Sequence, residues 1–482
     1  MIAFVPLLPA LPLLGALVAV FWPAAGGAVA ASVAVAVSLL LIPLAGMRAP
    51  LATDLGGWVP PLGIALQMDG LAVAFAGFSA VVMLAVVVAA PFRGTGRIAA
   101  AFWPLALLLW GALNAIFLSR DLFNLYVGLE LLSLAAVSLV ALDGKAEAIA
   151  AALRYLVFAL IGSLLYLLGA ALVYAAHGSL DLADLPQRVV AAPDLLAAGL
   201  MTAGLLVKTA LFPFHAWLPP AHSGAPAAAS AMLSALVPKA SFYILLRLWF
   251  DGMPDLGEPV FLALMGALGT AAILYGGLMA LRQDRLKLLI AYSTVAQLGY
   301  LFLVFPLAGG ADAAQPWAAG AWTATVFHAA AHAFAKAAMF LCAGLWLAAL
   351  GHDRIEGLRG MVRTTPMLVF AFALSAVSLM GLPPSGGFTA KYLMVTSAFA
   401  AGTPLWALGP LAGGLLAAVY LYRPLAEAFG APAPQDIRPV PRSRQIVPLL
   451  LALMAILLGV FSNPPFDLVQ IGRPAAAVEG VE

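Results

Sequence analysis

Four lysines and one glutamate lie inside long apolar stretches of this sequence. Glu130 sits within DLFNLYVGLELLSLAAVSL, and Lys336 lies within FHAAAHAFAKAAMF. Lys208 and Lys239 flank a proline-rich run, and Lys391 follows GLPPSGG. A lysine at the depth of a bilayer costs roughly 2.5–3.5 kcal/mol on the insertion scale, so such charges mark ion pathways or buried ion pairs.

Proton transfer is the chemistry that suits these residues. A lysine withdrawn from water favours its neutral form, and a nearby carboxylate restores the charged form. Glu130 is the only acid in the middle of an apolar stretch, so we predict that it pairs with Lys208. A static ion pair that joins two helices is the alternative for these two residues. A static pairing is harder to build for Lys239 and Lys391, which lack a second such acid.

Two histidines share a helical face with the third of these lysines. His328, His332 and Lys336 are spaced i, i+4 and i+8, which places them on one side of a helix over about 12 Å. Histidine titrates near neutral pH and can relay protons. His328 is favoured as a packing residue, and no metal site is predicted because Lys336 would repel a cation. The predicted proton relay therefore contains Glu130, Lys208, Lys239, His332, Lys336 and Lys391.

Other ionisable side chains lie beside the proline-rich run or near the ends of apolar stretches. His215 and His222 flank the break in the seventh stretch, where they either line a watery half-channel or cap broken helix ends. Asp69, Asp121 and Glu427 lie at the ends of stretches, and we expect them to be solvated.

The composition places these charges in a membrane. Of the 482 residues, 64% are hydrophobic and 9% are charged, whereas a typical soluble domain is about 25% charged. A net charge of +2 gives no basic field for nucleic acid, and the single cysteine, Cys342, excludes an internal disulfide. The first apolar run starts at Met1 without a basic region before it, so we expect a retained helix rather than a cleaved signal.

Fourteen apolar stretches are each long enough to cross a bilayer. The expected spans are 2–22, 24–46, 69–91, 98–118, 121–142, 149–176, 194–218, 225–250, 256–281, 284–306, 318–350, 366–400, 405–429 and 446–465. The seventh is interrupted by prolines and the twelfth by GLPPSGG. The sequence therefore predicts an all-α polytopic membrane protein with broken helices seven and twelve.

The two interrupted helices lie five spans apart. Because five is odd, spans four to eight and nine to thirteen would be inverted relative to each other, as in inverted-repeat transporters. Unrelated proline and glycine kinks are the alternative. The expected units are helices one to three at 1–97, two five-helix repeats at 98–250 and 251–430, and helix fourteen with its tail at 431–482.

Lysine and arginine are distributed unevenly between the two sets of loops. With fourteen spans, one side carries only Arg48, Arg120, Arg188, Arg247 and Arg473. The other carries Arg93, Arg97, Lys145, Arg154, Arg282, Arg285, Lys287, Arg354, Arg359, Arg363, Arg423, Arg438, Arg442 and Arg444. The positive-inside rule then predicts both termini outside a bacterial-type inner (cytoplasmic) membrane.

The motifs around these charges resemble the antiporter-like subunits shared by respiratory complex I, membrane-bound hydrogenases and Mrp-type multisubunit cation/proton antiporters. The resemblance covers roughly residues 69–430, and its strongest parts are DLFNLYVGLE, VKTALFPFHAWLPPAHSGAPAAASAM, DRLKLLIAYSTVAQLGY, HAAAHAFAKAAMF and GLPPSGGFTAK. It implies fourteen helices, inverted repeats and proton passage along a charged axis. It also implies that Lys208 and Glu130 form the broken-helix pair, that Lys239 is the central lysine, and that Lys391 is the terminal relay.

Within this family, DLFNLYV with its following Glu130 is most similar to the D-type subunit of Mrp-type antiporters. The chain ends soon after span fourteen, so it lacks the long extension of the largest antiporter-like subunit of complex I. It also differs from the middle antiporter-like subunit of complex I, which resembles a glutamate at the place of Lys391. We expect a proton-translocating subunit, with sodium/proton exchange as an extension of that function. A pumping M/N-type subunit of an NADH-quinone oxidoreductase or hydrogenase complex is the alternative.

An enzyme with its own redox centre is the competing class. The sequence has no CxxC cluster, haem-attachment motif or GxGxxG fingerprint, so we predict no cofactor and place any electron transfer in partner subunits. The sequence leaves open whether the assembled complex is an enzyme. It also leaves open a third hypothesis, in which the chain is a structural scaffold whose charges form static pairs. The predicted partners are other membrane subunits, protons and the lipid bilayer, with sodium ions if exchange occurs.

Overall fold

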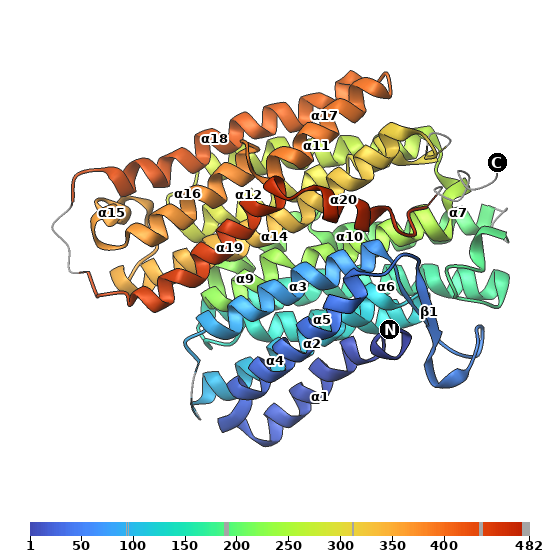
Figure 1. The fold of residues 1–482 in the computed structure, drawn as a ribbon, viewed down its shortest axis with the longest axis horizontal. Helices are drawn as coiled ribbons and strands as arrows, with labels where there is room; N and C mark the ends of the chain where they lie inside the picture. Colours follow the sequence, from blue (N-terminus) through green and yellow to red (C-terminus); the bar gives the residue numbers. More distant parts are fainter. Residues whose placement is uncertain (93, 95, 188–191, 311–312, 433–436, 475–482) are drawn as a thin grey trace.

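Long helices run side by side through the computed structural model of the chain (Figure 1). The structure describes residues 1–92, 94, 96–187, 192–310, 313–432 and 437–474, so Arg93 and Arg188 lie outside the described residues. The helices are α1 Leu7–Phe21, α2 Gly26–Ala45, α3 Gly70–Ala89, α4 Arg97–Leu118, α5 Leu122–Val140, α6 Ala146–His177, α7 Ala192–Thr209, α8 Leu218–Gly224, α9 Ala227–Ala235, α10 Val237–Leu246, α11 Pro259–Leu281, α12 Leu286–Leu301, α13 Val304–Ala308, α14 Pro316–Leu350, α15 Met361–Thr364, α16 Pro366–Met380, α17 Gly386–Ala400, α18 Leu408–Phe429, α19 Arg442–Val460 and α20 Asn463–Gln470.

The helical membrane fold is confirmed. Among the described residues, thirteen helical segments are long and apolar enough to cross a membrane. The remaining predicted span, 366–400, consists of α16 and α17, which have 15 residues each. Each of the fourteen predicted spans therefore corresponds to helix in the structure.

Both predicted helix breaks are present, and local residue chemistry explains them. The seventh span leaves the α-helix after Thr209, and Ala210 takes a positive φ of 56°. Pro213 follows, and a proline has no N–H to continue the helical ladder. In the twelfth span, Gly381 ends α16 with φ 83°, and the Ser385 side chain caps the first turn of α17.

The eighth span is also broken, although we predicted it as continuous. Helix α9 ends at Ala235 and α10 begins at Val237, with Leu236 at φ −123° and ψ −48° between them. The backbone N–H of Lys239 donates to Leu236 instead of Ala235. The freed Ala235 carbonyl accepts from the side chain of Lys239 itself. The kink thus gives a buried lysine a hydrogen-bond acceptor on its own helix.

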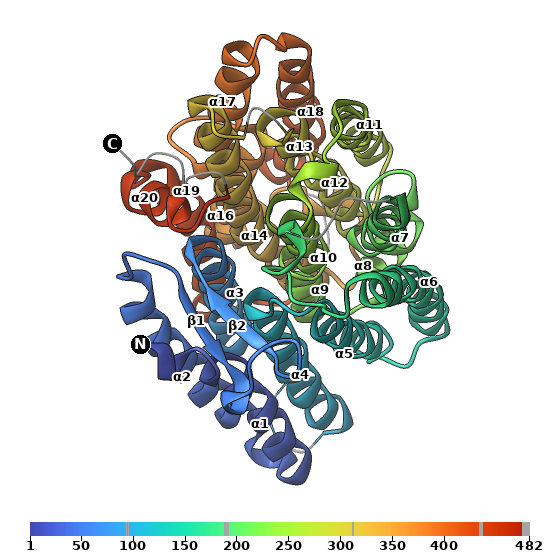
Figure 2. The ribbon, with the colours of Figure 1, turned by 90° about the vertical axis from the view of Figure 1, so that its right-hand side faces the viewer.

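A short β-hairpin, which the sequence analysis did not predict, covers one end of the bundle. Strands β1 (Leu51–Asp54) and β2 (Ala65–Met68) pair antiparallel, with Leu51 opposite Met68. The chain start and α20 lie at the same end (Figure 2), where Gly70 N donates to Ile471 O at 2.9 Å. Because the chain start and α20 lie at the same end, the helices between them cross the bundle an even number of times, which agrees with fourteen.

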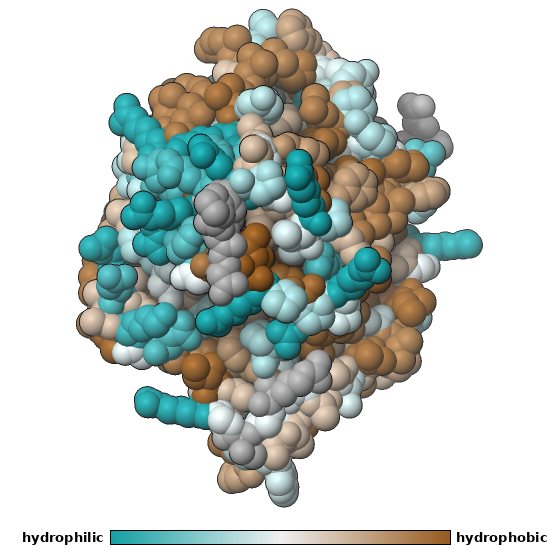
Figure 3. Space-filling view, turned by 90° about the vertical axis from the view of Figure 1, so that its left-hand side faces the viewer, coloured by the Kyte–Doolittle hydropathy of each residue, from teal (hydrophilic) through white to brown (hydrophobic). Residues whose placement is uncertain are grey.

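At the opposite end of the bundle, hydrophilic residues gather over the centre and one side of the face, among hydrophobic ones (Figure 3). Exposed arginines there include Arg359 just before α15, Arg363 within α15, Arg97 at the start of α4 and Arg442 at the start of α19. The structure therefore gathers at one end the basic loops that the sequence count assigned to one side.

Helix α14 forms the centre of the second half of the bundle, packed among α9, α12, α16, α17 and α19. Alanines occupy many of its contact positions, and small residues let membrane helices approach closely. Its middle turns are buried on nearly all sides. Polar side chains on these turns can therefore contact only other protein groups or enclosed water.

Candidate functional site

The first part of the site joins α5, α6 and α7. Lys208 Nζ lies 3.4 Å from Glu130 Oε1 and donates to Ser133 Oγ at 2.8 Å. Ser163 on α6 donates to the same glutamate oxygen. The Glu130 side chain is 24% exposed and that of Lys208 is 5% exposed, so the carboxylate faces the edge of the bundle. The predicted pair is in contact, and two hydroxyls that the sequence did not single out support it.

Close packing of α6 on α7 positions Lys208. A Cβ added at Gly204 would lie 2.2 Å from the carbonyl oxygen of Gly162. Only glycine therefore permits this approach of the two backbones. Lys208 follows in the last turn of α7, immediately before the break.

The second part of the site is a contact between a lysine and a histidine. Lys239 Nζ lies 2.8 Å from Nδ1 of His332 on α14, and both residues are fully buried. Neither residue has a carboxylate partner among the hydrogen bonds and ion pairs of the described residues. An ammonium can donate to the imidazole, or a neutral amine can accept from it, so the contact persists with the proton on either residue.

Lys336 contacts helix α12. Its Nζ donates to the Ile290 carbonyl at 3.0 Å and to the Ser293 hydroxyl. Lys336 is completely buried. Its partners are neutral, as are those of Lys239.

A line of aromatic rings leads from His332 towards the last lysine. The rings of His332 and His328 lie 6.1 Å apart, and Tyr300 follows at 4.8 Å from His328. His328 Nε2 also lies 3.0 Å from the Gln297 carbonyl. The structure thus places His328, which the sequence favoured as a packing residue, between two polar groups of the site.

Lys391 lies where the twelfth helix is broken. Its Nζ donates to the carbonyls of Leu379 at 2.7 Å and Met380 at 3.2 Å, and it lies 4.5 Å from the centre of the Tyr300 ring. The carbonyls at the end of a helix lack intrahelical partners, so the ammonium satisfies them. Lys391 also lines a cavity of about 460 Å³ between α16, α17 and α18.

The first and second parts of the site are adjacent but not directly bonded. Among the described residues, no hydrogen bond joins Lys208 to Lys239. Their helices are linked next to these lysines by a 3.0 Å hydrogen bond between Thr209 and Ser241. A proton that moves between the two lysines therefore needs a further carrier.

The proline-rich break holds buried rings and a capping lysine. His222 is stacked on Phe340 at 4.8 Å, and His215 lies 4.7 Å from the ring of Tyr275. Lys287, which the sequence count treated as a loop residue, is buried and donates to the carbonyls of Ser223 and Ala225. That lysine satisfies the end of α8.

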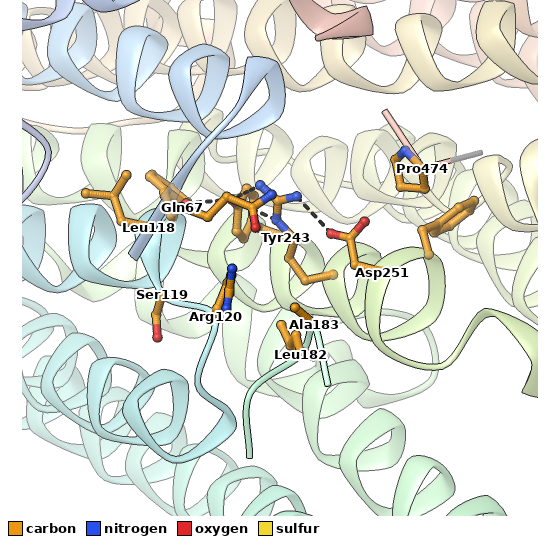
Figure 4. A pocket seen from close by; sticks show the side chains of 12 residues that line it. Gln67, Leu118, Ser119, Arg120, Leu182, Ala183, Tyr243, Asp251 and Pro474 are labelled. Carbon is orange, nitrogen blue, oxygen red and sulfur yellow. Dashed lines mark hydrogen bonds and ion pairs between the residues drawn. The ribbon is translucent and has the colours of Figure 1, made fainter. Parts of the chain in front are cut away.

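Asp69 is not solvated, contrary to our expectation. It is 1% exposed and forms two 2.7 Å contacts with Arg247, which also binds Asp251 at 2.8 Å. Tyr243 completes this cluster, which borders a cavity of about 310 Å³ beside the hairpin (Figure 4). The sequence separation of 178 residues hid the pairing.

A spacing signal could have revealed part of that cluster. Lys239, Tyr243, Arg247 and Asp251 recur every four residues, so they form a polar stripe that begins at the central lysine. Asp121 and Glu427 lie nearer the bundle ends, as expected. Asp121 is half-buried and caps α5, and Glu427 pairs with Arg359.

Comparisons with known proteins place all six predicted relay residues inside one matched region. The family described as "NADH:quinone oxidoreductase/Mrp antiporter, TM" matches residues 119–416. NADH-quinone oxidoreductase subunit N of Desulforudis audaxviator is 36% identical over 469 residues, covering 91% of this chain and 90% of that protein. The D-type subunit of the Na(+)/H(+) antiporter of Alkalihalophilus pseudofirmus is 29% identical over 427 residues, covering 86% of this chain and 84% of that protein.

The fold also matches a solved structure over nearly its whole length. A chain in the Mrp complex from Dietzia sp. DQ12-45-1b superposes with a TM-score of 0.88 at 22% identity, covering 99% of this chain and 98% of that chain. At this identity the similarity establishes a shared fold.

Proposed function

We propose, from the premise that this chain belongs to the NADH:quinone oxidoreductase/Mrp antiporter transmembrane family, that it conducts protons within a multisubunit membrane complex. The chain is an antiporter-like membrane subunit, and its relatives are named as subunits of larger assemblies. The assignment as an antiporter-like membrane subunit does not include proton conduction through the lysines of this chain, which is the part that we propose.

The contact between Lys239 and His332 carries the proposal. A static salt bridge needs opposite charges, and this buried lysine instead meets an imidazole at 2.8 Å. A lysine kept charged in such a place without an acid is costly. If Lys239 and His332 exchange one proton, the burial of both residues in contact with each other and without an acid is explained.

Each remaining residue has a role that follows from its contacts. Glu130 favours the charged form of Lys208 while the two are close, and its withdrawal releases a proton towards Lys239. His332 takes the proton from Lys239. Lys336 and Lys391 continue the path towards the cavity between α16, α17 and α18.

Two assemblies fit the chain, and different observations favour them. The DLFNLYV motif supports the D-type subunit of an Mrp-type antiporter, in which sodium ions would exchange with protons. The higher identity to a subunit N, 36% against 29%, supports a pump in a complex driven by electron transfer. Purification of the native complex in mild detergent, with partners identified by mass, separates the two. Flavin, iron–sulfur or nickel subunits identify the pump, and small hydrophobic partners alone identify the antiporter.

The proposed orientation places the basic end in the cytoplasm and the hairpin and both termini outside. The five-helix units 98–250 and 251–430 would then be inverted copies that meet at the contact between Lys239 and His332. Cys342 is buried, so new surface cysteines can be labelled selectively. An impermeant thiol reagent added to intact cells should label Leu62→Cys, which lies in the hairpin, and not Arg442→Cys. The reverse pattern would overturn the orientation.

The relay is tested by proton transport in proteoliposomes that contain the native complex. A pH-sensitive dye reports the internal pH, and the driving input is an electron donor or a sodium gradient, as the partner subunits dictate. Lys239→Met should lower transport by roughly a hundredfold or more, the scale of a positioned proton carrier. Lys145→Met, on an exposed loop, is the matched control. Wild-type transport in an assembled Lys239→Met complex would refute the proposal.

A further inference from the structure

An apolar cavity lies between four helices at the basic end of the bundle. It has a volume of about 280 Å³ and is bordered by the end of α3, the start of α9, the last turns of α14 and the start of α19. Ala228, Leu341 and Gly344 are among the residues that line it. Because each of these helices has an end beside the cavity, the cavity lies at the level where the chain leaves the membrane.

The cavity opens to the surroundings of the bundle. Along α14, Ala348 is exposed and Leu345 and Leu347 are half-buried, whereas the middle turns of this helix are covered. The part of α14 that lines the cavity, from Leu341 to Ala348, extends about 10 Å along the helix axis. An acyl chain of a lipid beside the bundle can therefore enter between the helices.

A single charged side chain borders this apolar space. Of the described residues that line the cavity, only Arg444 carries a charge. It is exposed in the first turn of α19. None of the ion pairs among the described residues includes it. The Arg444 guanidinium is therefore available to an anion from outside the chain.

The surroundings of Arg444 also favour an anion. In the part of the chain that the structure describes, no side chain caps the start of α19, and its first turn holds no acid. The first N–H groups of a helix lack intrahelical acceptors and attract negative charge. Arg442 begins the same helix, and the Arg438 N–H donates to the Ala349 carbonyl at the end of α14. Basic pockets between membrane helices are typical sites for anionic headgroups.

We propose that the cavity binds a phospholipid with a net negative headgroup, whose phosphate contacts Arg444 while one acyl chain enters between α3, α9, α14 and α19. Burial of apolar surface favours the chain, and the arginine selects the charge of the headgroup. A free phosphate would use the arginine and leave the cavity empty. A zwitterionic phospholipid would fill the cavity, but its own cation offsets the phosphate. The site goes beyond proton conduction, since it contains none of the relay residues.

Photochemical cross-linking in the purified native complex tests the site. The probe is a phosphatidylglycerol with a diazirine near the middle of one acyl chain, added in mild detergent and activated by light. We expect mass spectrometry to find the cross-link in peptides that contain Ala227–Ala228 or Leu341–Ala348. Unlabelled phosphatidylglycerol should compete at about fivefold lower concentration than phosphatidylcholine with the same chains, which is the contribution of one basic residue near an anionic surface.

Arg444→Gln separates the headgroup from the chain. This variant should need about fivefold more phosphatidylglycerol for competition and the same amount of phosphatidylcholine, so the preference disappears. Arg363→Gln is the matched control, because Arg363 is exposed at the same end of the bundle and lies outside the cavity lining. The control should keep the wild-type preference. Unchanged competition by phosphatidylglycerol in the Arg444→Gln complex would overturn the headgroup site.

Ala348→Phe tests the cavity, because it places a ring at the open side. Ala348 is exposed, so the larger side chain does not displace the core. We expect the cross-link to fall at least about tenfold, the contribution of two buried methylene groups. A cross-link of wild-type strength in this variant would overturn the cavity site. So would its absence from both peptides in the wild-type complex, as when a partner subunit covers the cavity. Equal competition by glycerol phosphate, which has no chains, would show an anion site alone and also overturn the proposal.

Discussion

Replacement of Asp69 by asparagine should destabilise the protein through Arg247. Asp69 makes two 2.7 Å contacts with this arginine, and its side chain is 1% exposed. Asparagine keeps the cap on the first turn of α3, where Asp69 accepts from Ala72 N, because both residues are good N-caps. The substitution therefore keeps the cap and removes the charge, and it replaces the oxygen that accepts from Arg247 Nη1 by an amino group that cannot accept.

The size of the effect follows from what remains around the arginine. Removing one partner of a buried ion pair costs roughly 3–5 kcal/mol. Asp251 still binds Arg247 at 2.8 Å after the change, so we expect the low end, about 3 kcal/mol. Asp251→Asn should cost less, about 1 kcal/mol, because the Asp251 side chain is 26% exposed and Asp69 stays in place.

Unfolding by SDS in mixed micelles measures the free energy of unfolding of each variant. Asp255→Asn, an exposed acid at the same end of the bundle, is the control and should match the wild type. The double variant of Asp69 and Asp251 should lose more than the sum of the single changes, since it leaves Arg247 buried without a carboxylate. An Asp69→Asn protein within about 0.5 kcal/mol of the wild type, the scatter expected for surface changes, would refute this account.

Three further predictions test the relay and its support. Glu130→Gln should lower proton transport at least about tenfold, and Ser163→Ala, which keeps the carboxylate, should lower it less, as measured by dye response in proteoliposomes. Lys287→Met leaves two carbonyls at the end of α8 without their buried donor, so the free energy of unfolding should fall by about 1–3 kcal/mol. Gly204→Ala should reduce the yield of assembled complex because its Cβ meets backbone 2.2 Å away, whereas Gly199→Ala, which faces open space on the same helix, should not; equal yields would contradict the packing.

The positions of the costly charges could be read from the sequence. A lysine in an apolar stretch is recognisable without a structure, and this marked Lys208, Lys239, Lys336 and Lys391. The breaks in helices seven and twelve followed equally well from proline and glycine. These features depend on a residue and its near neighbours, which the sequence states directly.

Apart from Glu130, which was predicted as the partner of Lys208, the partners of those lysines could not be read in the same way. Ser293 and Tyr300 have ordinary types and spacing, and only the tertiary packing of α12 brings Ser293 to Lys336 and Tyr300 to Lys391. The break in the eighth helix was also missed. Pro238 lies next to Lys239 at this break, and nothing in the local sequence shows that the freed carbonyl would receive the lysine.

Asp69 shows the difference between what the sequence predicts and what only the tertiary structure determines. From the sequence alone, an aspartate at the end of an apolar stretch is expected to reach water. In the structure, a helix end 178 residues away supplies Arg247, and the carboxylate is buried against it. The sequence by itself determined the membrane fold, the helix breaks and the lysines, because transfer to lipid and backbone geometry are local properties. The tertiary structure alone decided which groups pair with Asp69, Lys239, Lys336 and Lys391, because pairing depends on distances of a few ångströms between helices that are remote along the chain.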